Sequence, residues 1–340
     1  MKTSEFDYQL PKSFIAMEPR KPRDSSRLMV LDKKKGTMNH KHFYDLMEIL
    51  DNNYVLVFNN SKVIPARILF EIDGKSMEIF ILKKIEDNFY ECLAKPGKKF
   101  ELNAIFRIHP KISVKIEKVN GDGTRLIRFL MTKGTELRSY LNELGQVPFP
   151  PYLEGTKASF EDYQTVYSKT DGSVAAPTAG LHFTENLLGK LREKGVGMAF
   201  ATLHVGLGTF QPVKTEIIEE HKMHSEIFEL DQDTADFLNN AKAAGKKIVA
   251  VGTTSVRILE SCSNKNGKIN AKTGETSIFI YPGYEWKFVD AMITNFHLPK
   301  STLLMLISSF AGKDSVFKAY EEAKKQNYRF FSFGDAMLII

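Results

Sequence analysis

Short apolar runs alternate with amphipathic stretches towards both ends of the chain. Runs of four to nine mostly apolar residues predict strands that are buried on both faces, and apolar residues at helical spacing predict the helices between them. Strands are expected at residues 28–31, 54–58, 197–205 and 247–251, and helices at residues 40–50, 185–195 and 231–244. This alternation predicts an α/β domain with a largely parallel sheet.

The middle of the chain follows a different pattern. Across residues 66–144, apolar and polar positions alternate in short pieces such as KISVKIEKV, with turn residues at Asp73-Gly74 and Pro96-Gly97. Short strands at regular spacing predict a small all-β barrel. The proline-rich stretch QVPFPPY at 146–152 marks its end. We therefore expect a barrel domain at 66–146, inserted into an α/β domain made of residues 1–65 and 147–340.

Composition narrows the class of protein only slightly. The 340 residues are 43% hydrophobic and 26% charged, as is ordinary for a globular chain of about two domains. The net charge of +6 resides mostly in the β insert. This charge fits an RNA-facing surface and a merely solvated sheet face equally well.

The cellular location is predicted from the cysteine count and from the first residues and the apolar stretches of the sequence. Two cysteines without CxxC spacing favour a reducing compartment. The first residues, MKTSEFDYQLP, carry no apolar signal core. The longest apolar stretch, 303–307, is far below the roughly 20 residues that span a bilayer. We predict a cytoplasmic protein that does not contact a membrane.

The strongest site signal is the pair of strings VAAPTAGLHFTE (174–185) and HVGLGTFQP (204–212). Glycine allows a backbone to approach a ligand closely, proline stiffens the approach, and histidine suits proton transfer near neutral pH. Each string joins an extended run to a helical one, where clefts of α/β sheets form. The candidates are Pro177, Thr178, Gly180, His182, Glu185, His204, Gly206 and Gly208.

A second candidate site is the string VAVGTTSVRILES at 249–261. A buried strand runs into a glycine, three hydroxyl residues and a helix, and free N–H groups at a helix start bind anions. An arginine one turn on adds a possible bidentate contact. A well-capped helix that binds nothing explains the pattern equally well. The candidates are Gly252, Thr253, Thr254, Ser255 and Arg257.

Polar residues near the end of the chain form a third group. Asn295, His297 and Lys300 follow an apolar run and precede a helix that Ser301 or Thr302 opens. The final residues, YRFFSFGDAMLII, end in a docked strand. Asp335 within them suits either a structural cap or the recognition of a base.

Two further histidines, His221 and His224, would share one face of a helix. A metal site needs a third and a fourth ligand, and no HExxH or cysteine-rich partner is present. We therefore predict no metal, and the acid–base interpretation of the histidines is the more attractive one.

Many long strings of the chain resemble one family. LPKSFIAMEP, RDSSRLMVLD, VFNNSKVIPAR, SVAAPTAGLHFT, TLHVGLGTFQPV, AVGTTSVRILES, VDAMITNFHLPKSTLLMLISSFAG and YRFFSFGDAMLI occur in order, and together they resemble the S-adenosylmethionine:tRNA ribosyltransferase-isomerases of queuosine biosynthesis. Phe333 stands where the family suggests tyrosine, and Ser309 where alanine is common. The β insert matches only loosely.

The resemblance implies a reaction and a fold. Ribose from S-adenosylmethionine is transferred and rearranged onto 7-aminomethyl-7-deazaguanine at the tRNA wobble position, giving epoxyqueuosine-tRNA, adenine and methionine. S-adenosylmethionine is a co-substrate here, and no cofactor is implied. The implied fold is an α/β domain built from both chain ends and interrupted by a small β-barrel. The expected partners are S-adenosylmethionine and tRNA carrying that base, and we expect a monomer.

The same chemistry assigns candidate roles. A base must remove a C5′ proton next to the sulfonium, and an acid must protonate the departing adenine. Aromatic faces suit the sulfonium cation, and the helix start suits the methionine carboxylate. Carboxylates suit the guanine-like edge of the base. The candidates for the base are His182, His204, His224 and Glu185, with His297 as a further catalytic histidine; Tyr281 and Tyr284 for the sulfonium; Gly252–Ser255 with Arg257 for the carboxylate; Asp290 and Asp335 for the base edge.

Two other classes of protein remain open from the residues alone. A metal-dependent hydrolase would use His221 and His224, and metal analysis would reveal it. A non-catalytic RNA-binding protein would use the basic insert as its platform. Both explain the charge, and neither explains the strings of glycine and histidine.

Overall fold

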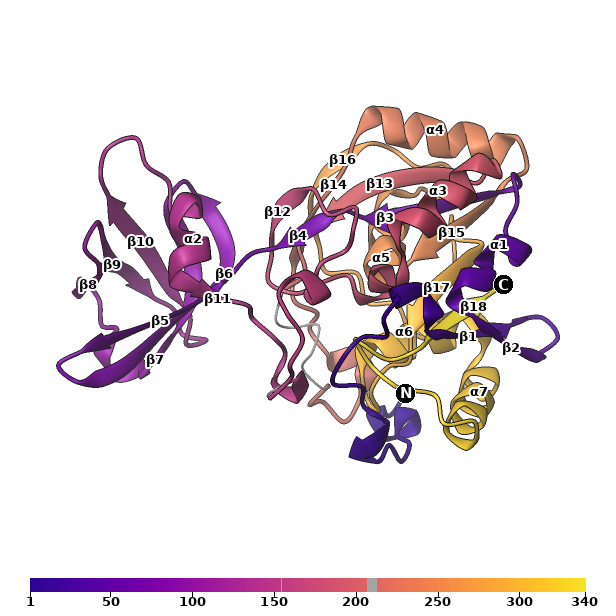
Figure 1. Cartoon of the computed structure of the whole chain (residues 1–340), viewed down its shortest axis with the longest axis horizontal. Helices are drawn as coiled ribbons and strands as arrows, with labels where there is room; N and C mark the ends of the chain where they lie inside the picture. The colour runs from indigo at the N-terminus through magenta and orange to yellow at the C-terminus, as the bar shows by residue number, and fades with distance from the viewer. Residues whose placement is uncertain (154, 207–212) are drawn as a thin grey trace. The chain divides into compact units, whose positions relative to one another are not determined.

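The computed structural model describes residues 1–153, 155–206 and 213–340. Contacts divide the chain into two compact units, whose elements are labelled in Figure 1. The first unit comprises Met1–Lys62, Leu153–Thr170 and Ala176–Ile340, and the second comprises Val63–Tyr152 and Asp171–Ala175.

A nine-stranded sheet organises the first unit, in the order β16-β14-β13-β3-β15-β17-β18-β1-β2. Its four central strands, β13, β3, β15 and β17, run parallel. Of the flanking pairs, β18 and β1 are parallel and the rest are antiparallel. The strands are β1 (Arg27–Leu31), β2 (Met38–His42), β3 (Tyr54–Asn59), β13 (Gly197–Leu203), β14 (Glu226–Leu230), β15 (Lys247–Val251), β16 (Lys272–Thr276), β17 (Ala291–Asn295) and β18 (Ala336–Ile339).

The sheet is therefore mixed, and the prediction of a largely parallel sheet was wrong for its flanks. Periodicity marks a buried strand but carries no information on its direction. The four predicted strands do form, as β1, β3, β13 and β15. A short strand pair, β4 (Ser61–Val63) with β12 (Thr170–Ser173), forms a separate sheet.

Polar side chains begin the helices as the sequence predicts. Thr184 accepts a hydrogen bond from the Leu187 amide, and Ser301 accepts one from the Leu304 amide, which satisfies donors that the helix itself leaves free. None of the helices in the described ranges has both the length and the apolar character to cross a bilayer. The helices are α1 (Leu46–Ile49), α3 (Glu185–Glu193), α4 (Gln232–Ala243), α5 (Thr253–Cys262), α6 (Thr302–Ala311) and α7 (Lys313–Lys325).

One expected helix, over residues 40–50, was only partly right. His40 and His42 lie in the edge strand β2, where they pair with Met29 and Arg27 of β1. Helix starts only afterwards, in a 3₁₀ turn and the single-turn α1. Pairing with an open sheet edge outweighs a local helical spacing of this length, because helices this short are marginal on their own.

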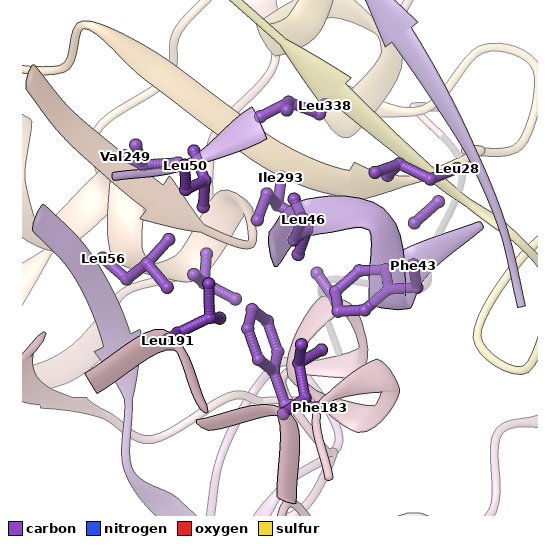
Figure 2. Close-up of a cluster of buried hydrophobic side chains, with 14 of the residues drawn as sticks. Leu28, Phe43, Leu46, Leu50, Leu56, Phe183, Leu191, Val249, Ile293 and Leu338 are labelled. Carbon is purple, nitrogen blue, oxygen red and sulfur yellow. The ribbon is translucent and has the colours of Figure 1, made fainter. Parts of the chain in front are cut away.

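A cluster of apolar side chains packs one face of this sheet beneath α1 and α3 (Figure 2). Burial of each large side chain stabilises the fold by about 1.5–3 kcal/mol. Phe43 also lies against His182 and Phe183, so this core holds the segment 178–182 in place. The labelled members are Leu28, Phe43, Leu46, Leu50, Leu56, Phe183, Leu191, Val249, Ile293 and Leu338.

The second unit is a curled antiparallel sheet of seven strands, in the order β11-β5-β6-β7-β10-β9-β8. The predicted antiparallel β module is present, but it is not all-β, because it includes the helix α2; β11 and β8 end the strand order, so the described strands form a half-barrel and not a closed barrel. Register shifts place an extra residue in β6, β8 and β9, and such bulges bend the strands. Its elements are β5 (Arg67–Ile72), β6 (Lys75–Glu86), β7 (Phe89–Lys95), β8 (Ile105–His109), β9 (Ile112–Val119), β10 (Arg125–Met131), α2 (Arg138–Leu144) and β11 (Gly145–Gln146).

Candidate active site

The carboxyl ends of the central parallel strands bring the three predicted segments to one edge of the sheet. His204 follows β13, Gly252 follows β15, and Asn295 ends β17. In open α/β sheets this edge is where ligands bind. Segments that are far apart in the sequence thus meet because their strands run in the same direction.

A pocket opens at this edge, entirely within the first unit. Its walls come from the segment before α3, from the start of α5, from the end of β17 and from the loop before β18. The lining residues are Ala176, Pro177, Thr178, Ala179, Val205, Gly252, Thr253, Thr254, Thr294, Asn295, His297, Leu303, Phe331 and Ser332.

His182 lies behind this wall in a chain of hydrogen bonds. Thr178 donates its hydroxyl to Asn295 Oδ1 at 2.8 Å, which orients the amide so that its Nδ2 donates to His182 Nε2 at 3.1 Å. The other ring nitrogen, Nδ1, then donates to Ser26 Oγ at 2.8 Å. Both ring nitrogens of His182 are therefore engaged.

Burial lowers the pKa of His182 to about 3, and the positive charges of Arg329 and Arg23 add to the effect. The imidazole is consequently neutral at physiological pH. A neutral ring with both nitrogens bonded holds Asn295 and Thr178 in position, and it is a poor proton acceptor.

His204 has a different environment. Its Nδ1 lies 2.8 Å from Ser61 Oγ, and its Nε2 has no hydrogen-bond partner within the described ranges. Burial lowers its pKa, but the residue is only half-buried. A histidine with one nitrogen oriented by a hydroxyl and the other free has the arrangement of a general base.

His297 lines the pocket and is almost fully buried. Its Nε2 lies 2.7 Å from Thr294 Oγ1, its backbone amide donates to Tyr320 Oη at 2.7 Å, and burial lowers its pKa to about 3. Lys300 is absent from the lining and forms an ion pair with Asp7 at 2.7 Å. The predicted trio is thus split, with Asn295 and His297 in the pocket and Lys300 outside it.

The start of α5 lines the pocket as predicted. Gly252 has a φ of 86°, a conformation that suits glycine, and it turns the chain from β15 into the helix. Thr254 is only 7% exposed, and its hydroxyl has no hydrogen-bond partner. The Ser255 hydroxyl instead donates to the carbonyl of Val251, so its proton is not available to a ligand. A buried hydroxyl without a partner is costly unless a ligand or water satisfies it.

Arg257, expected to contact an anion, is committed elsewhere. It forms a buried ion pair with Glu226, and both side chains are 4% exposed. The same carboxylate accepts a hydrogen bond at 2.9 Å from the Gly206 amide. Glu226 was not predicted, although an acidic residue beginning an apolar strand (EIFEL) is a signal that could have found it.

Several other candidates have clear structural partners. Tyr284 donates to Glu260 Oε2 at 3.0 Å, and Tyr281 packs on Phe279 with ring centroids 4.9 Å apart. Asp335 is buried and accepts hydrogen bonds from the backbone amides of Arg27 and Arg329, so its structural role is that of a cap.

The remaining candidates lie away from the pocket lining. Asp290 precedes β17, at the opposite edge of the sheet, and pairs with Lys242 at 2.9 Å. Gly180 lies against Tyr167, where a Cβ would clash with the phenol oxygen. Glu185 and His224 are exposed, and Gly208 lies outside the described residues.

The His221–His224 segment is not helical: a 3₁₀ turn ends at Glu220, and both histidines follow in irregular backbone. Within the described ranges, no group of three or more His, Cys, Asp or Glu side chains is placed to hold a metal ion.

The known proteins that are similar to this chain all point to one family. Residues 3–339 match the family described as "Queuosine biosynthesis protein". Two relatives named S-adenosylmethionine:tRNA ribosyltransferase-isomerase are 50% identical (Finegoldia magna; 100% of this chain and 98% of the relative) and 51% identical (Clostridioides difficile; 100% of both). The crystal structure of S-adenosylmethionine tRNA ribosyltransferase from Thermotoga maritima has 40% identity and a TM-score of 0.57, covering 99% of this chain and 100% of that one.

A mixed α/β sheet with a pocket at its carboxyl edge, together with relatives of this identity, defines an enzyme, a transferase and isomerase. The chain belongs to the queuosine biosynthesis protein family. The resemblance predicted from its strings is confirmed.

Proposed function

We propose that this enzyme transfers and isomerises the ribosyl group of S-adenosylmethionine onto 7-aminomethyl-7-deazaguanine at the wobble position of tRNA. The products are epoxyqueuosine-tRNA, adenine and methionine. The observation that carries the proposal is the pocket in which residues 176–179, 252–254 and 294–297 meet. These segments belong to three of the strings on which the family resemblance rests.

The start of α5 suits the methionine carboxylate of S-adenosylmethionine. Free amides at a helix start favour an anion, and the unpartnered Thr254 hydroxyl supplies a donor that is already desolvated. Arg257 has no part in this contact, because Glu226 holds it. The carboxylate is thus bound by amides and a hydroxyl.

Among the four candidate bases, His204 is the one we propose to remove the C5′ proton. That proton is acidified by the adjacent sulfonium, so a neutral imidazole with a free Nε2 is sufficient. Ser61 orients the ring, and the neighbouring Val205 lines the pocket. His182 is a positioning residue, since it holds Asn295, which in turn is bonded to Thr178.

We further propose, as predicted from the sequence, that the enzyme acts in the cytoplasm as a monomer and that residues 66–146 form an inserted domain. The sedimentation of the purified protein tests the monomer directly.

The activity is tested by mixing purified protein with S-adenosylmethionine and tRNA that carries the aminomethyl-deazaguanine base. Adenine release together with an epoxycyclopentane-bearing nucleoside is the expected result. Folded protein that releases no adenine and leaves the nucleoside mass unchanged would overturn the proposal. Unmodified tRNA serves as the control, because it lacks the accepting amine.

A further inference from the structure

A second, smaller pocket lies on the other side of His182. Arg20, Arg23 and His182 contribute to its walls, together with Ser332, which also lines the first pocket. The two pockets are therefore neighbours within the first unit. The first is lined by neutral polar and apolar groups, whereas arginines gather at the second.

The arginines at this second pocket lack carboxylate hydrogen bonds. Arg20 is exposed and makes no hydrogen bond or ion pair with the described residues. The guanidinium of Arg23 donates to the backbone carbonyls of Gln164 and Glu161, and the carboxylate that attracts its charge, on Asp162, makes no hydrogen bond to it.

A third arginine, Arg329, adds its charge from beside the pocket. Its Nη1 donates to the carbonyl of Glu18 at 3.0 Å, while Nε and Nη2 are buried without a hydrogen-bond partner. The closest carboxylate oxygen, on Asp335, is 4.0 Å away and already accepts a backbone amide. Arg329 does not itself line the pocket, but it carries two buried donors that no protein group satisfies.

Acidic groups close to the pocket are occupied. Asp162 pairs with Lys21 at 3.5 Å and accepts the Ser159 amide. Asp24 accepts the Thr184 hydroxyl at 2.7 Å. The positive potential reaches the pocket wall, because Arg329 and Arg23 both contribute to lowering the pKa of His182.

We propose that this pocket binds a backbone phosphate of the tRNA, next to the nucleotide being modified. The inference rests on the proposed function. Guanidinium forks match the geometry of phosphate oxygens, and a base entering the first pocket must leave its stack, which brings its own phosphates to the protein surface. The shared wall at Ser332 makes the two pockets neighbours, as a nucleotide and its phosphate require.

The test compares Arg20→Ala with Arg192→Ala. Both remove one charge from an exposed arginine, and Arg192 lies on α3 with only a weak contact to Met198. The Kd for tRNA is measured over a series of salt concentrations, and the Kd for S-adenosylmethionine is measured separately. We expect Arg20→Ala to weaken tRNA binding about tenfold and to reduce the salt slope by about 1, as one lost phosphate contact does. Arg192→Ala should behave like the wild type.

A second variant, Arg329→Lys, keeps the charge but removes the planar fork. We expect weaker tRNA binding with a nearly unchanged salt slope. Equal tRNA affinity and salt slope in Arg20→Ala and Arg192→Ala would overturn the phosphate site. A rise in the Kd for S-adenosylmethionine without a change for tRNA would also overturn it and would assign the pocket to the methionine carboxylate.

Adenine release by the wild-type enzyme is measured on the same samples. If the wild type releases adenine and Arg20→Ala binds tRNA normally, the phosphate site fails and the proposed function stands. If the wild type releases none, the proposed function fails, and the salt dependence still reports on whether this pocket binds RNA phosphate.

Discussion

The two edges of the large sheet use polar residues in opposite ways. At the amino edge, Asp290 pairs with Lys242 and also accepts the Ile248 amide at 2.8 Å. At the carboxyl edge, the Thr254 hydroxyl is buried without a partner, and His204 keeps a free ring nitrogen within the described part of the chain.

The difference separates stabilising polar groups from binding ones. Buried polar groups that find partners within the protein contribute to its stability, whereas those left unsatisfied lower it unless a ligand completes them. An aspartate before a strand and a threonine after one look equally functional in the sequence. Only the second stands at the edge where the pocket lies.

The largest expected effect at the carboxyl edge comes from His204→Gln. Loss of a general base lowers the rate about 10²–10⁴-fold, so adenine release should fall by that factor while thermal unfolding is nearly unchanged. His42→Gln, on the exposed edge strand β2, is the matched control. A His204→Gln enzyme as fast as the control would mean that another group removes the proton.

Acid should destabilise the protein through its buried histidines. The pKa values of His182 and His297 are about 3 in the fold and about 6.5 in the unfolded chain. The stability is complete above pH 6.5 or so and is lost as the pH falls towards 3, by about 1.4 kcal/mol per pH unit for each histidine. Urea unfolding at several pH values measures this slope.

The control for the acid experiment is His182→Gln, which removes one of the histidines whose pKa falls to about 3. Its slope below about pH 6.5 should be shallower than that of the wild type by about 1.4 kcal/mol per pH unit. An unchanged slope would show that His182 takes up no extra proton on unfolding.

At the amino edge, Asp290→Asn should lower stability and leave catalysis intact. The change removes a charge-assisted pair with Lys242 but keeps an acceptor for the Ile248 amide, so the free energy of unfolding should fall by about 1–2 kcal/mol. Asp236→Asn, exposed on α4, is the surface control. A loss of turnover in Asp290→Asn at full stability would contradict the contrast between the edges.

The smallest effect is expected from Thr254→Val. Removing a donor that binds the substrate should raise the KM for S-adenosylmethionine about tenfold. The unfolding free energy should stay level or rise, because a buried hydroxyl without a partner disappears. Thr215→Val removes a similar unpartnered hydroxyl outside the pocket lining and should leave KM unchanged. Equal KM values for the two variants would exclude Thr254 from the binding site.

Much of the local structure was predictable from sequence because its causes are local. Thr184 and Ser301 were recognised as helix starts, and both accept the expected amide hydrogen bonds. The strands at 54–58 and 247–251 were recognised because their apolar runs fit a sheet covered on both sides. The turn at Gly252 followed from its place between a strand and a hydroxyl-rich helix start.

Other features depended on partners that lie far along the chain. Arg257 looked like an anion ligand until Glu226, 31 residues away, was found to hold it. From the sequence, Asp335 suits a structural cap and the recognition of a nucleobase equally well. In the structure its carboxylate accepts hydrogen bonds from the backbone amides of Arg27 and Arg329, which makes it a cap.

By itself, the sequence determined the family, the alternation of strands and helices, and three of the segments that line the pocket. Those properties follow from residue order, periodicity and the short-range preferences of glycine, proline and capping side chains. Only the tertiary structure decided which polar groups are satisfied, because hydrogen bonds and ion pairs depend on distance in space. Asn295 and Ser26 bond the two ring nitrogens of His182, and Ser61 bonds one nitrogen of His204 and leaves the other free. Each of these partners is far along the chain from the histidine that it contacts.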